Sequence, residues 1–325
     1  MKTAVVLFNL GGPDNLDAVE PFLRNLFSDP AIITLPNPLR WLLAKLISSR
    51  RTPIARGIYE KIGGKSPLRE LTEAQAAALE ASLNAGSADE HRIFVAMRYW
   101  HPFADETATK VAAFAPDRVL LLPLYPQYSS TTTGSSFKDW HRAAKTAGIA
   151  VPMFEVRDYP DHAGYVAALA GQLRLGLKAA CEKGPFRLLF SAHGLPKKVI
   201  AAGDPYQAQI ERTAAAVVAA LGPDAEGLDW QVCYQSRVGR LEWIGPSTDD
   251  EILRAAKASL GLVVMPIAFV SEHSETLVEL DIEYRELAIH HGVPFYIRVP
   301  ALGTDAGFIE ALADLTRTCL SATWA

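Results

Sequence analysis

The chain has 325 residues, 49% of them hydrophobic, which is enough for two globular domains with buried cores. Its 32 Lys and Arg residues are balanced by 36 Asp and Glu residues, and a formal net charge of −4 argues against nucleic acid as a partner. Three cysteines without a CxxC pair argue against a disulfide framework and a zinc ribbon, and they suit a reducing cytoplasm.

The N-terminal residues predict a strand rather than an export signal. MKTAVVLFNLGGP places a short apolar run directly before a Gly-Gly-Pro turn, whereas a signal peptide requires a longer apolar stretch. No apolar stretch approaches the roughly 20 residues that are needed to span a bilayer. We therefore expect a cytoplasmic protein without a membrane-spanning segment.

Short apolar runs alternate with helical stretches along the chain, which predicts an α/β fold with parallel sheets flanked by helices. We place a domain boundary between residues 147 and 148. The predicted strands are Ala4–Leu10, Arg92–Met97, Arg118–Leu124, Val151–Val156, Arg187–Ser191, Trp230–Tyr234, Gly261–Ala268 and Pro294–Val299. The predicted helices include Thr72–Asn84, Asp105–Phe114, Ala163–Ala180, Pro205–Ala220 and Asp249–Leu260.

A histidine follows the predicted strand Arg187–Ser191, within the sequence SAHGLP at residues 191–196. Ligands of doubly wound sheets bind beyond the carboxyl ends of the strands, so His193 is expected to face a binding site. A neutral imidazole, with a pKa of about 6.5, either accepts a proton near neutral pH or binds a metal. The alternative is a structural histidine that is hydrogen-bonded at a turn.

The segment SEHSETLVELDIE at residues 271–283 carries five carboxylates and a histidine. Glu275, Glu279 and Glu283 are four residues apart, so they would stack along one face of an α-helix. This pattern indicates either a solvated acidic face or a ladder of oxygen ligands or proton carriers for a cation. His273 adds a nitrogen ligand that suits Fe²⁺ or Zn²⁺ better than Ca²⁺.

Small polar residues follow two other strands, at residues 125–136 and 235–240. Their backbone N–H groups are able to bind an anion at a helix start, although ordinary caps and turns explain them equally well. The nucleotide-binding patterns GxxxxGK[ST] and GxGxxG are both absent from the sequence.

Residues 36–51 combine an apolar helical face with flanking basic residues. Leu39, Leu42, Leu43 and Leu46 share this face, with Arg50 and Arg51 beside it. Such a helix either lies on an anionic membrane surface or packs into the protein core, because the same periodicity serves both purposes.

Nine segments occur in a fixed order along the chain: FNLGGP at 8–13, RRTP at 50–53, YEKIGGKSP at 59–67, RYWHP at 98–102, LYPQYSSTTTGSS at 124–136, SAHGLP at 191–196, YQSRVG at 234–239, WIGP at 243–246 and PIAFVSEHSETLVELDIEY at 266–284. Together they resemble the ferrochelatases, and the resemblance extends over most of the chain, from residue 8 to residue 284. The resemblance implies two Rossmann-like domains, residues 1–147 and 148–305, that hold a porphyrin in a cleft. It also implies that helix 306–325 packs back on the first domain.

The resemblance assigns roles to particular residues. His193 matches the histidine that accepts the pyrrole protons or binds the metal, and Glu275 matches its carboxylate partner. Glu279 and His273 continue a polar path along a helix that carries a π-bulge in relatives, which would alter the four-residue stacking. We expect these four residues to handle the metal. The residues expected to contact the porphyrin are Leu10, Tyr59, Ser66, Arg98, Tyr125 and Trp243.

The sequence departs from some relatives at two points. Its C-terminal tail offers only Cys319, so the four thiolates of a [2Fe–2S] cluster cannot be assembled, and no cluster is expected. Leu10 stands where relatives have Met or Tyr, which excludes a tyrosine axial ligand from that site. It also argues against a coproporphyrin-specific relative of the tyrosine type.

The resemblance implies a lyase that inserts Fe²⁺ into protoporphyrin IX, the terminal step of haem biosynthesis, with release of two protons. Such chemistry requires a base and exchangeable oxygen ligands, but no organic cofactor. We expect a monomer with peripheral membrane contact. The alternatives are a coproporphyrin ferrochelatase, another tetrapyrrole chelatase, and a haem or metal carrier without chemistry. A hydrolase using Ser191 lacks the GxSxG turn.

Overall fold

The computed structural model describes residues 1–237, 239 and 241–321, and the chain divides into two compact units. Unit 1 comprises Met1–Asp158 and the chain from Leu312 onward, and unit 2 comprises Tyr159–Ala311. The expected helix 306–325 is observed as α11 (Ala306–Ser321), and its positions 322–325 lie outside the described residues, as do positions 238 and 240 of the polar stretch 235–240.

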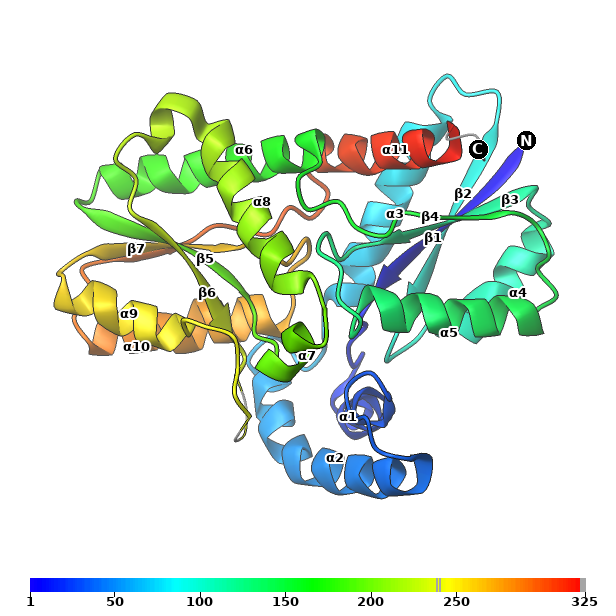
Figure 1. Ribbon diagram of the computed structural model, residues 1–325, viewed down its shortest axis with the longest axis horizontal. Helices are drawn as coiled ribbons and strands as arrows, with labels where there is room; N and C mark the ends of the chain where they lie inside the picture. The colour runs from blue at the N-terminus through cyan, green and yellow to red at the C-terminus, as the bar shows by residue number, and fades with distance from the viewer. Residues whose placement is uncertain (238, 240, 322–325) are drawn as a thin grey trace. The chain divides into compact units, whose positions relative to one another are not determined.

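Unit 1 is built on a parallel sheet of four strands in the order β2-β1-β3-β4 (Figure 1). The central strands β1 and β3 are buried on both faces, which is why they are almost continuously apolar in sequence. The strands are β1 (Lys2–Asn9), β2 (Glu90–Met97), β3 (Arg118–Pro123) and β4 (Met153–Glu155). The helices are η1 (Leu16–Ala18), α1 (Val19–Ser28), α2 (Asn37–Glu60), α3 (Leu68–Asn84), α4 (Ala104–Phe114) and α5 (Thr133–Thr146).

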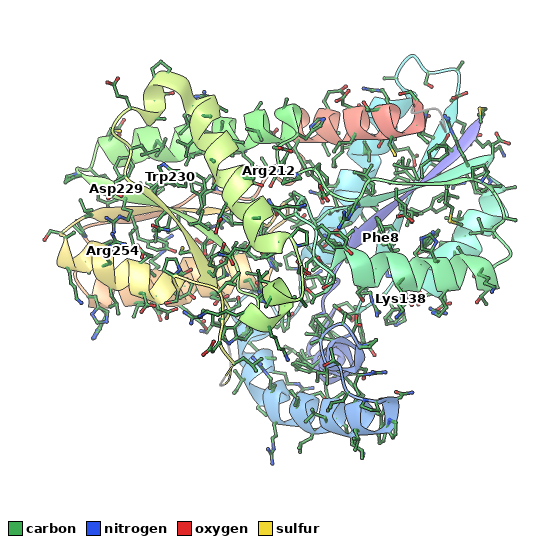
Figure 2. All side chains as sticks on the ribbon, in the orientation of Figure 1. Phe8, Lys138, Arg212, Asp229, Trp230 and Arg254 are labelled. Carbon is green, nitrogen blue, oxygen red and sulfur yellow. The ribbon has the colours of Figure 1, made fainter. Side chains whose placement is uncertain are left out.

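Aromatic side chains of β1 and α5 form the core on one face of this sheet. Phe8, labelled in Figure 2, packs edge-on against Phe137 and Trp140, with ring centroids 5.5 and 5.9 Å apart. Trp140 is completely buried. Because edge-on packing of large rings is favourable and specific, these contacts fix α5 against the sheet.

Unit 2 repeats the same architecture with the strand order β6-β5-β7-β8, again all parallel (Figure 1). Its strands are β5 (Phe186–His193), β6 (Trp230–Gln235), β7 (Gly261–Pro266) and β8 (Tyr296–Arg298). Its helices are α6 (Ala163–Cys181), α7 (Lys197–Ala201), α8 (Tyr206–Leu221), η2 (Gly222–Ala225), α9 (Thr248–Lys257), the π-helix η3 (Glu275–Glu283) and α10 (Tyr284–His290).

The predicted α/β class with two parallel sheets is confirmed, and each predicted strand overlaps an observed one. The structure places the domain boundary after Asp158 rather than after residue 147. The reason is that β4 is hydrogen-bonded to β3, so this strand completes the first sheet instead of starting the second.

Strand register in unit 2 brings two polar strand ends to the same level. His193, the last residue of β5, pairs with Gln235, the last residue of β6. The chain changes its direction of winding at β5, which lies between β6 and β7. In doubly wound sheets this switch point, at the carboxyl ends of the strands, is where ligands bind.

Candidate active site

The site in unit 2 is built from the ends of two strands and the start of a helix. His193 ends β5, Gln235 ends β6 and is followed by Ser236, and Glu275 begins η3. The strands hold His193 and Gln235 rigidly through the sheet. Residues from three separate parts of the chain thus meet at one edge of the sheet.

Gly194 allows the two strand ends to approach each other. Its N–H donates to the carbonyl oxygen of Gln235 at 2.8 Å. A Cβ atom at this position would lie 2.9 Å from that oxygen, closer than side chains tolerate. Glycine is therefore required directly after His193, and it turns the chain away while the imidazole stays at the edge.

His193 and Glu275 form the central pair of the site. The Nδ1 atom of His193 lies 2.8 Å from Oε2 of Glu275, and the two side chains are 39% and 26% exposed. Burial opposes the charged imidazole, but the carboxylate outweighs it and raises the pKa of His193 above its ordinary value. Burial likewise opposes the charged carboxylate, yet His193, with help from His273 and Ser236, lowers the pKa of Glu275 to about 2.

Glu279 lies one step further along the polar path and is surrounded by donors. Its Oε2 atom accepts from the amide of Gln235 at 2.9 Å and from the hydroxyl of Ser236 at 2.5 Å, and its Oε1 atom accepts from the Ser236 N–H at 2.7 Å. Burial and the nearby charge of Glu275 raise the pKa of Glu279. The Ser236 hydroxyl also reaches Glu275, at 3.3 Å, and so links the two carboxylates.

Ser236 adopts a left-handed backbone conformation, with φ of 60°. This conformation is unfavourable for residues other than glycine and is concentrated at functional sites. It directs both the N–H and the hydroxyl of Ser236 at Glu279. The strand end thus presents two donors to one carboxylate.

The π-helix η3 changes which side chains share a face. In a π-helix the backbone bonds run from residue i to residue i+5, and the Tyr284 N–H donates to the carbonyl oxygen of Glu279. The Tyr284 hydroxyl lies 3.2 Å from Oε1 of Glu279 and 3.3 Å from Oδ2 of the exposed Asp249. The expected third member of the ladder, Glu283, is exposed and stays outside it.

A continuous hydrogen-bonded path therefore runs from the imidazole to the surface. It leads from His193 through Glu275, Ser236, Glu279 and Tyr284. The exposed carboxylate next to the Tyr284 hydroxyl completes it. The Ser236 and Tyr284 hydroxyls each carry one proton and donate it to one carboxylate at a time, so such a path carries protons in separate steps.

His273 lies beside this path but not within it. The residue is 8% exposed, its ring lies tilted against Phe269 with centroids 4.6 Å apart, and its Nδ1 atom has no hydrogen-bond partner among the described residues. Burial lowers the pKa of His273, which keeps the ring neutral with a free lone pair. Within the described residues, no three His, Cys, Asp or Glu side chains are placed to hold one metal ion together.

Trp243 lies alongside the loop that follows His193. Its backbone forms an antiparallel bridge with Pro196, and the next residue, Ile244, donates to the Leu195 carbonyl oxygen at 3.0 Å. The indole Nε1 atom is buried, and no residue that the structure describes forms a hydrogen bond with it. The structure therefore brings this predicted porphyrin contact to the SAHGLP loop within unit 2.

The other predicted porphyrin contacts belong to unit 1. Leu10 and Tyr125 share the core cluster on the α5 side of the sheet. Tyr59 and Ser66, each 7% exposed, lie beside Gly12, where a Cβ atom would come within 2.5 Å of the serine side chain. The Gly-Gly-Pro turn thus packs closely against Ser66.

Arg98 forms an ion pair and a hydrogen bond with other residues of unit 1. Its guanidinium pairs with Asp29 at 2.8 Å and donates to the Ser135 hydroxyl at 2.8 Å, and the arginine side chain is 19% exposed. Asp29 is buried and also accepts from the Tyr99 hydroxyl. The charge of Arg98 is therefore already balanced by a carboxylate.

Four residues of these networks were not predicted as site residues: Gln235, Ser236, Tyr284 and Asp29. Gln235 and Ser236 lie directly after a predicted strand, so their place at the strand end is a signal that points to them. Tyr284 is five residues after Glu279, a spacing that matters only in a π-helix. Asp29 has no comparable signal, because it lies far from Arg98 in sequence.

The match to a family model decides the family of this chain. The ferrochelatase model matches residues 2–320. The chain belongs to the ferrochelatase family. Proteins named ferrochelatase from Caulobacter vibrioides (strain NA1000 / CB15N) and Phenylobacterium zucineum (strain HLK1) are each 58% identical over 97% of this chain and 90% of their own length. The ferrochelatase of Wolbachia sp. subsp. Drosophila simulans is 52% identical over 97% of this chain and 98% of its own.

Solved structures of other chelatases share the fold of this ferrochelatase-family protein. The sirohydrochlorin chelatase SirB from Bacillus subtilis subspecies spizizenii, in complex with cobalt, matches with a TM-score of 0.56 at 11% identity, over 99% of this chain and 97% of that chain. CbiX, the terminal enzyme for biosynthesis of siroheme in denitrifying bacteria, matches with a TM-score of 0.51 at 16% identity, over 99% of this chain and 100% of that chain. These similarities support the two-sheet fold alone.

Proposed function

We propose that this protein inserts Fe²⁺ into protoporphyrin IX to give protohaem and two protons, as the terminal step of haem biosynthesis. The observation that carries the proposal is the His193–Glu275 pair at the switch point of unit 2, connected through Ser236 to Glu279. Membership of the ferrochelatase family supports it. The reaction is of the lyase type.

The geometry of His193 suits a base for the pyrrole protons. Its Nδ1–H donates to Glu275, which leaves the lone pair of Nε2 free to accept a proton. Glu275 then stabilises the imidazolium that forms, as the raised pKa of His193 indicates. Glu275 stays charged and keeps the Nδ1–H in place, so the accepted proton leaves from Nε2 to solvent, to which the His193 side chain is 39% exposed, and the neutral base is restored for the second pyrrole N–H.

Oxygen and nitrogen ligands along the same path would receive the substrate iron. Fe²⁺ exchanges its waters for carboxylate oxygens and imidazole nitrogens. We propose that His193, Glu275, Glu279 and His273 serve in succession, because the described residues hold no ready-made cluster of three ligands. The unpartnered Nδ1 of His273 supports its inclusion.

An anaerobic metalation assay tests the proposed function. We expect the Soret band of protoporphyrin IX to change over many turnovers with Fe²⁺, and an indicator dye to register two protons for each metal inserted. Coproporphyrin is expected to react more slowly, since Leu10 replaces the tyrosine of one type of relative. A single stoichiometric spectral change without turnover would instead identify a carrier, and faster turnover of coproporphyrin would identify the alternative substrate.

We also propose that α2 contacts an anionic membrane surface. Its apolar side chains Leu39, Leu42 and Leu46 are 56%, 57% and 48% exposed, so this face of the helix does not pack into the core. Exposed apolar residues beside basic ones are typical of helices that lie in the membrane interface. The described part of the chain contains no helix long and apolar enough to cross a bilayer.

Charge reversal at the basic end of α2 tests this contact. The double variant Arg50→Glu with Arg51→Glu is expected to weaken binding to anionic vesicles in co-sedimentation by at least about 30-fold, because each basic residue lost near such a surface removes about 1 kcal/mol and the new carboxylates are repelled. Arg142→Glu with Lys145→Glu on α5 is the control of equal charge. Co-sedimentation that is unaffected by the α2 variant would count against the contact.

Neither a cluster nor an organic cofactor has a part in the proposed reaction. The chain has three cysteines, fewer than the four thiolates of a [2Fe–2S] cluster. Burial raises the pKa of Cys233 to about 12, which makes this thiol a poor ligand. We propose that the protein acts as a cytoplasmic monomer with protoporphyrin IX and Fe²⁺ as its partners.

A further inference from the structure

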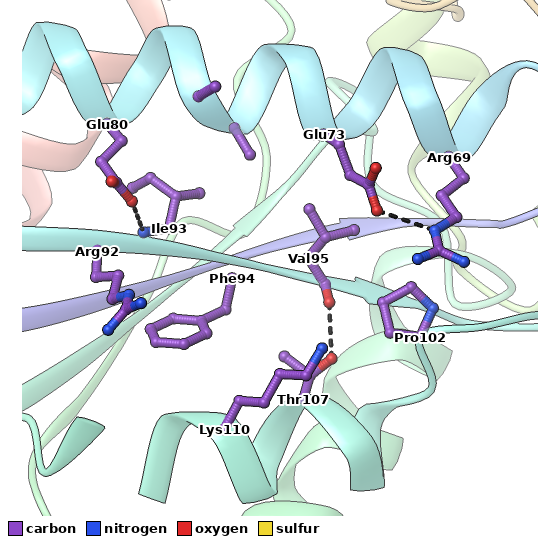
Figure 3. A pocket seen from close by; sticks show the side chains of 12 residues that line it. Arg69, Glu73, Glu80, Arg92, Ile93, Phe94, Val95, Pro102, Thr107 and Lys110 are labelled. Atoms are coloured by element: carbon purple, nitrogen blue, oxygen red, sulfur yellow. Dashed lines mark hydrogen bonds and ion pairs between the residues drawn. The ribbon is translucent and has the colours of Figure 1, made fainter. Parts of the chain in front are cut away.

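Unit 1 contains a groove that the proposed reaction does not use, shown in Figure 3. It runs beside β2 between α3 and α4, and its volume is about 400 Å³, within the range of pockets that bind ligands. We call it the β2 groove. Its lining includes Arg69, Glu73, Ala76, Phe94, Thr107 and Lys110.

The β2 groove follows the edge of a sheet, because among the strands of the described residues β2 has β1 as its one neighbour. An edge strand exposes N–H and C=O groups that are able to pair with another chain. At the two ends of β2 the protein covers these groups itself. The Asn84 side chain bonds both backbone groups of His91, at 2.9 and 2.8 Å, and the Met97 N–H donates to the Pro102 carbonyl oxygen at 2.7 Å.

In the middle of β2, only two of the four outward-facing backbone groups of Ile93 and Val95 are hydrogen-bonded to residues that the structure describes. The Ile93 N–H donates to the Glu80 carboxylate at 2.8 Å, and the Val95 C=O accepts from the Thr107 hydroxyl at 2.7 Å (Figure 3). The Ile93 C=O and the Val95 N–H face the same groove, and neither forms a hydrogen bond with the described residues. One open acceptor and one open donor therefore flank Phe94.

These two groups match one residue of an added parallel strand. In a parallel ladder, a residue opposite Phe94 donates its N–H to the carbonyl of the preceding residue and accepts from the N–H of the following one. The covered groups on both sides prevent a longer ladder. The groove therefore fits a short extended peptide and excludes a full strand.

The charges of the groove determine which side chain such a peptide would carry. The side chains of Arg92 and Phe94 lie on the α4 side of β2, with the guanidinium 5.9 Å from the ring centroid, and Lys110 projects from α4 beside them. Neither Arg92 nor Lys110 forms an ion pair with the part of the chain that the structure describes. A residue opposite Phe94 would place its side chain on this side.

The α3 side of the groove has a different character. Arg69 is already paired with Glu73, at 2.9 Å, so its charge is balanced. Beside this pair lie Ala76 and the side chains of Ile93 and Val95. The residues that flank the central one in an added strand point to this face, because side chains alternate along a strand.

We propose that the β2 groove binds a short extended segment of a partner protein, parallel to β2, with an acidic residue opposite Phe94 and an apolar residue on each side of it. The backbone of the segment bonds the Ile93 C=O and the Val95 N–H. Its carboxylate lies between Arg92 and Lys110. This mode of recognition is strand addition limited to a single residue.

Blocked tripeptides test the proposal on the full-length protein. Ac-Val-Glu-Val-NH₂ is expected to shift the amide resonance of Val95 in a saturable titration, and Ac-Val-Gln-Val-NH₂ to bind about two- to fivefold more weakly, the factor that an exposed ion pair provides. In the variant Lys110→Glu the preference for an acidic peptide is expected to reverse, so that Ac-Val-Lys-Val-NH₂ binds more tightly than Ac-Val-Glu-Val-NH₂. The matched change Lys138→Glu on α5 (Figure 2) is expected to leave the preference for the acidic peptide unchanged.

The variant Val95→Pro removes the open N–H from an edge position, where proline is tolerated. It is expected to weaken peptide binding about two- to tenfold, the contribution of one hydrogen bond. If this variant does not fold, the titration of the Val95 amide in the unaltered protein still tests the proposal. A Val95 resonance that does not move, equal affinity for the Glu and Gln peptides, or displacement of the peptide by equimolar inorganic phosphate would overturn the proposal.

Discussion

His193→Ala is expected to reduce metalation by about 10²- to 10⁴-fold, the contribution of a positioned general base. The imidazole is the only basic nitrogen that the described residues place in contact with Glu275, and its free Nε2 has no substitute there. The measurement is the steady-state rate of Fe²⁺ insertion into protoporphyrin IX under anaerobic conditions. We expect the KM for Fe²⁺ to change less than kcat, since the loss falls on the proton transfer.

The control for this variant is another histidine that pairs with a glutamate. His141 lies 2.7 Å from Glu155 on the surface of unit 1, so His141→Ala removes a similar contact without affecting the site. Circular dichroism and thermal unfolding check that both variants fold. If His193→Ala destabilises the protein, His193→Asn retains a hydrogen-bonding group toward Glu275. Near-normal turnover by either folded variant would contradict the role of His193 as the base.

Glu275→Gln is expected to move the acid limb of the pH–rate profile to lower pH and to reduce kcat by about 10²-fold. The neutral imidazole is the active form, so activity falls as the pH drops through the pKa of His193. Glu275 raises that pKa in the native protein, and the amide removes its charge. The pKa of His193 therefore falls, and the neutral base persists to lower pH. The reduced kcat reflects the lost stabilisation of the imidazolium.

The direction of this shift shows which member of the pair, His193 or Glu275, titrates in the acid limb of the pH–rate profile. The pKa of Glu275 is about 2, so this carboxylate stays charged throughout the accessible pH range and cannot itself produce the acid limb. Nuclear magnetic resonance of the His193 imidazole measures its pKa directly in both proteins. Glu155→Gln is the matched control for the loss of a carboxylate beside a histidine. An acid limb that moves to higher pH, or an unchanged pKa of His193, would refute the assignment.

Much of the fold is readable from the sequence. Strands such as β1 and β7 are buried on both faces, so they appear as continuous apolar runs whose limits are easy to place. The edge strand β4 is harder to assign to a sheet, because its three residues carry no information about which strand they pair with. That is why the predicted boundary fell on the wrong side of β4.

The candidate site is only partly readable. The position of His193 at a strand end and the acidic residues from Glu275 onward are visible in the sequence, and the resemblance to the family connects them. The i, i+4 periodicity of an α-helix predicts Glu283 as the next member of the path. The π-helical winding of η3 places Tyr284 there instead, because each turn contains more residues.

The sequence by itself determined the alternating elements, the family and the chemical groups available for catalysis, because these depend on local composition and order. Tertiary structure decided three further points. It joined Arg98 to Asp29, it directed both donors of Ser236 at Glu279, and it left the apolar face of α2 exposed. Each of these depends on contacts between residues distant in the chain or on the absence of such contacts, and hydrophobic periodicity along one segment carries no record of either.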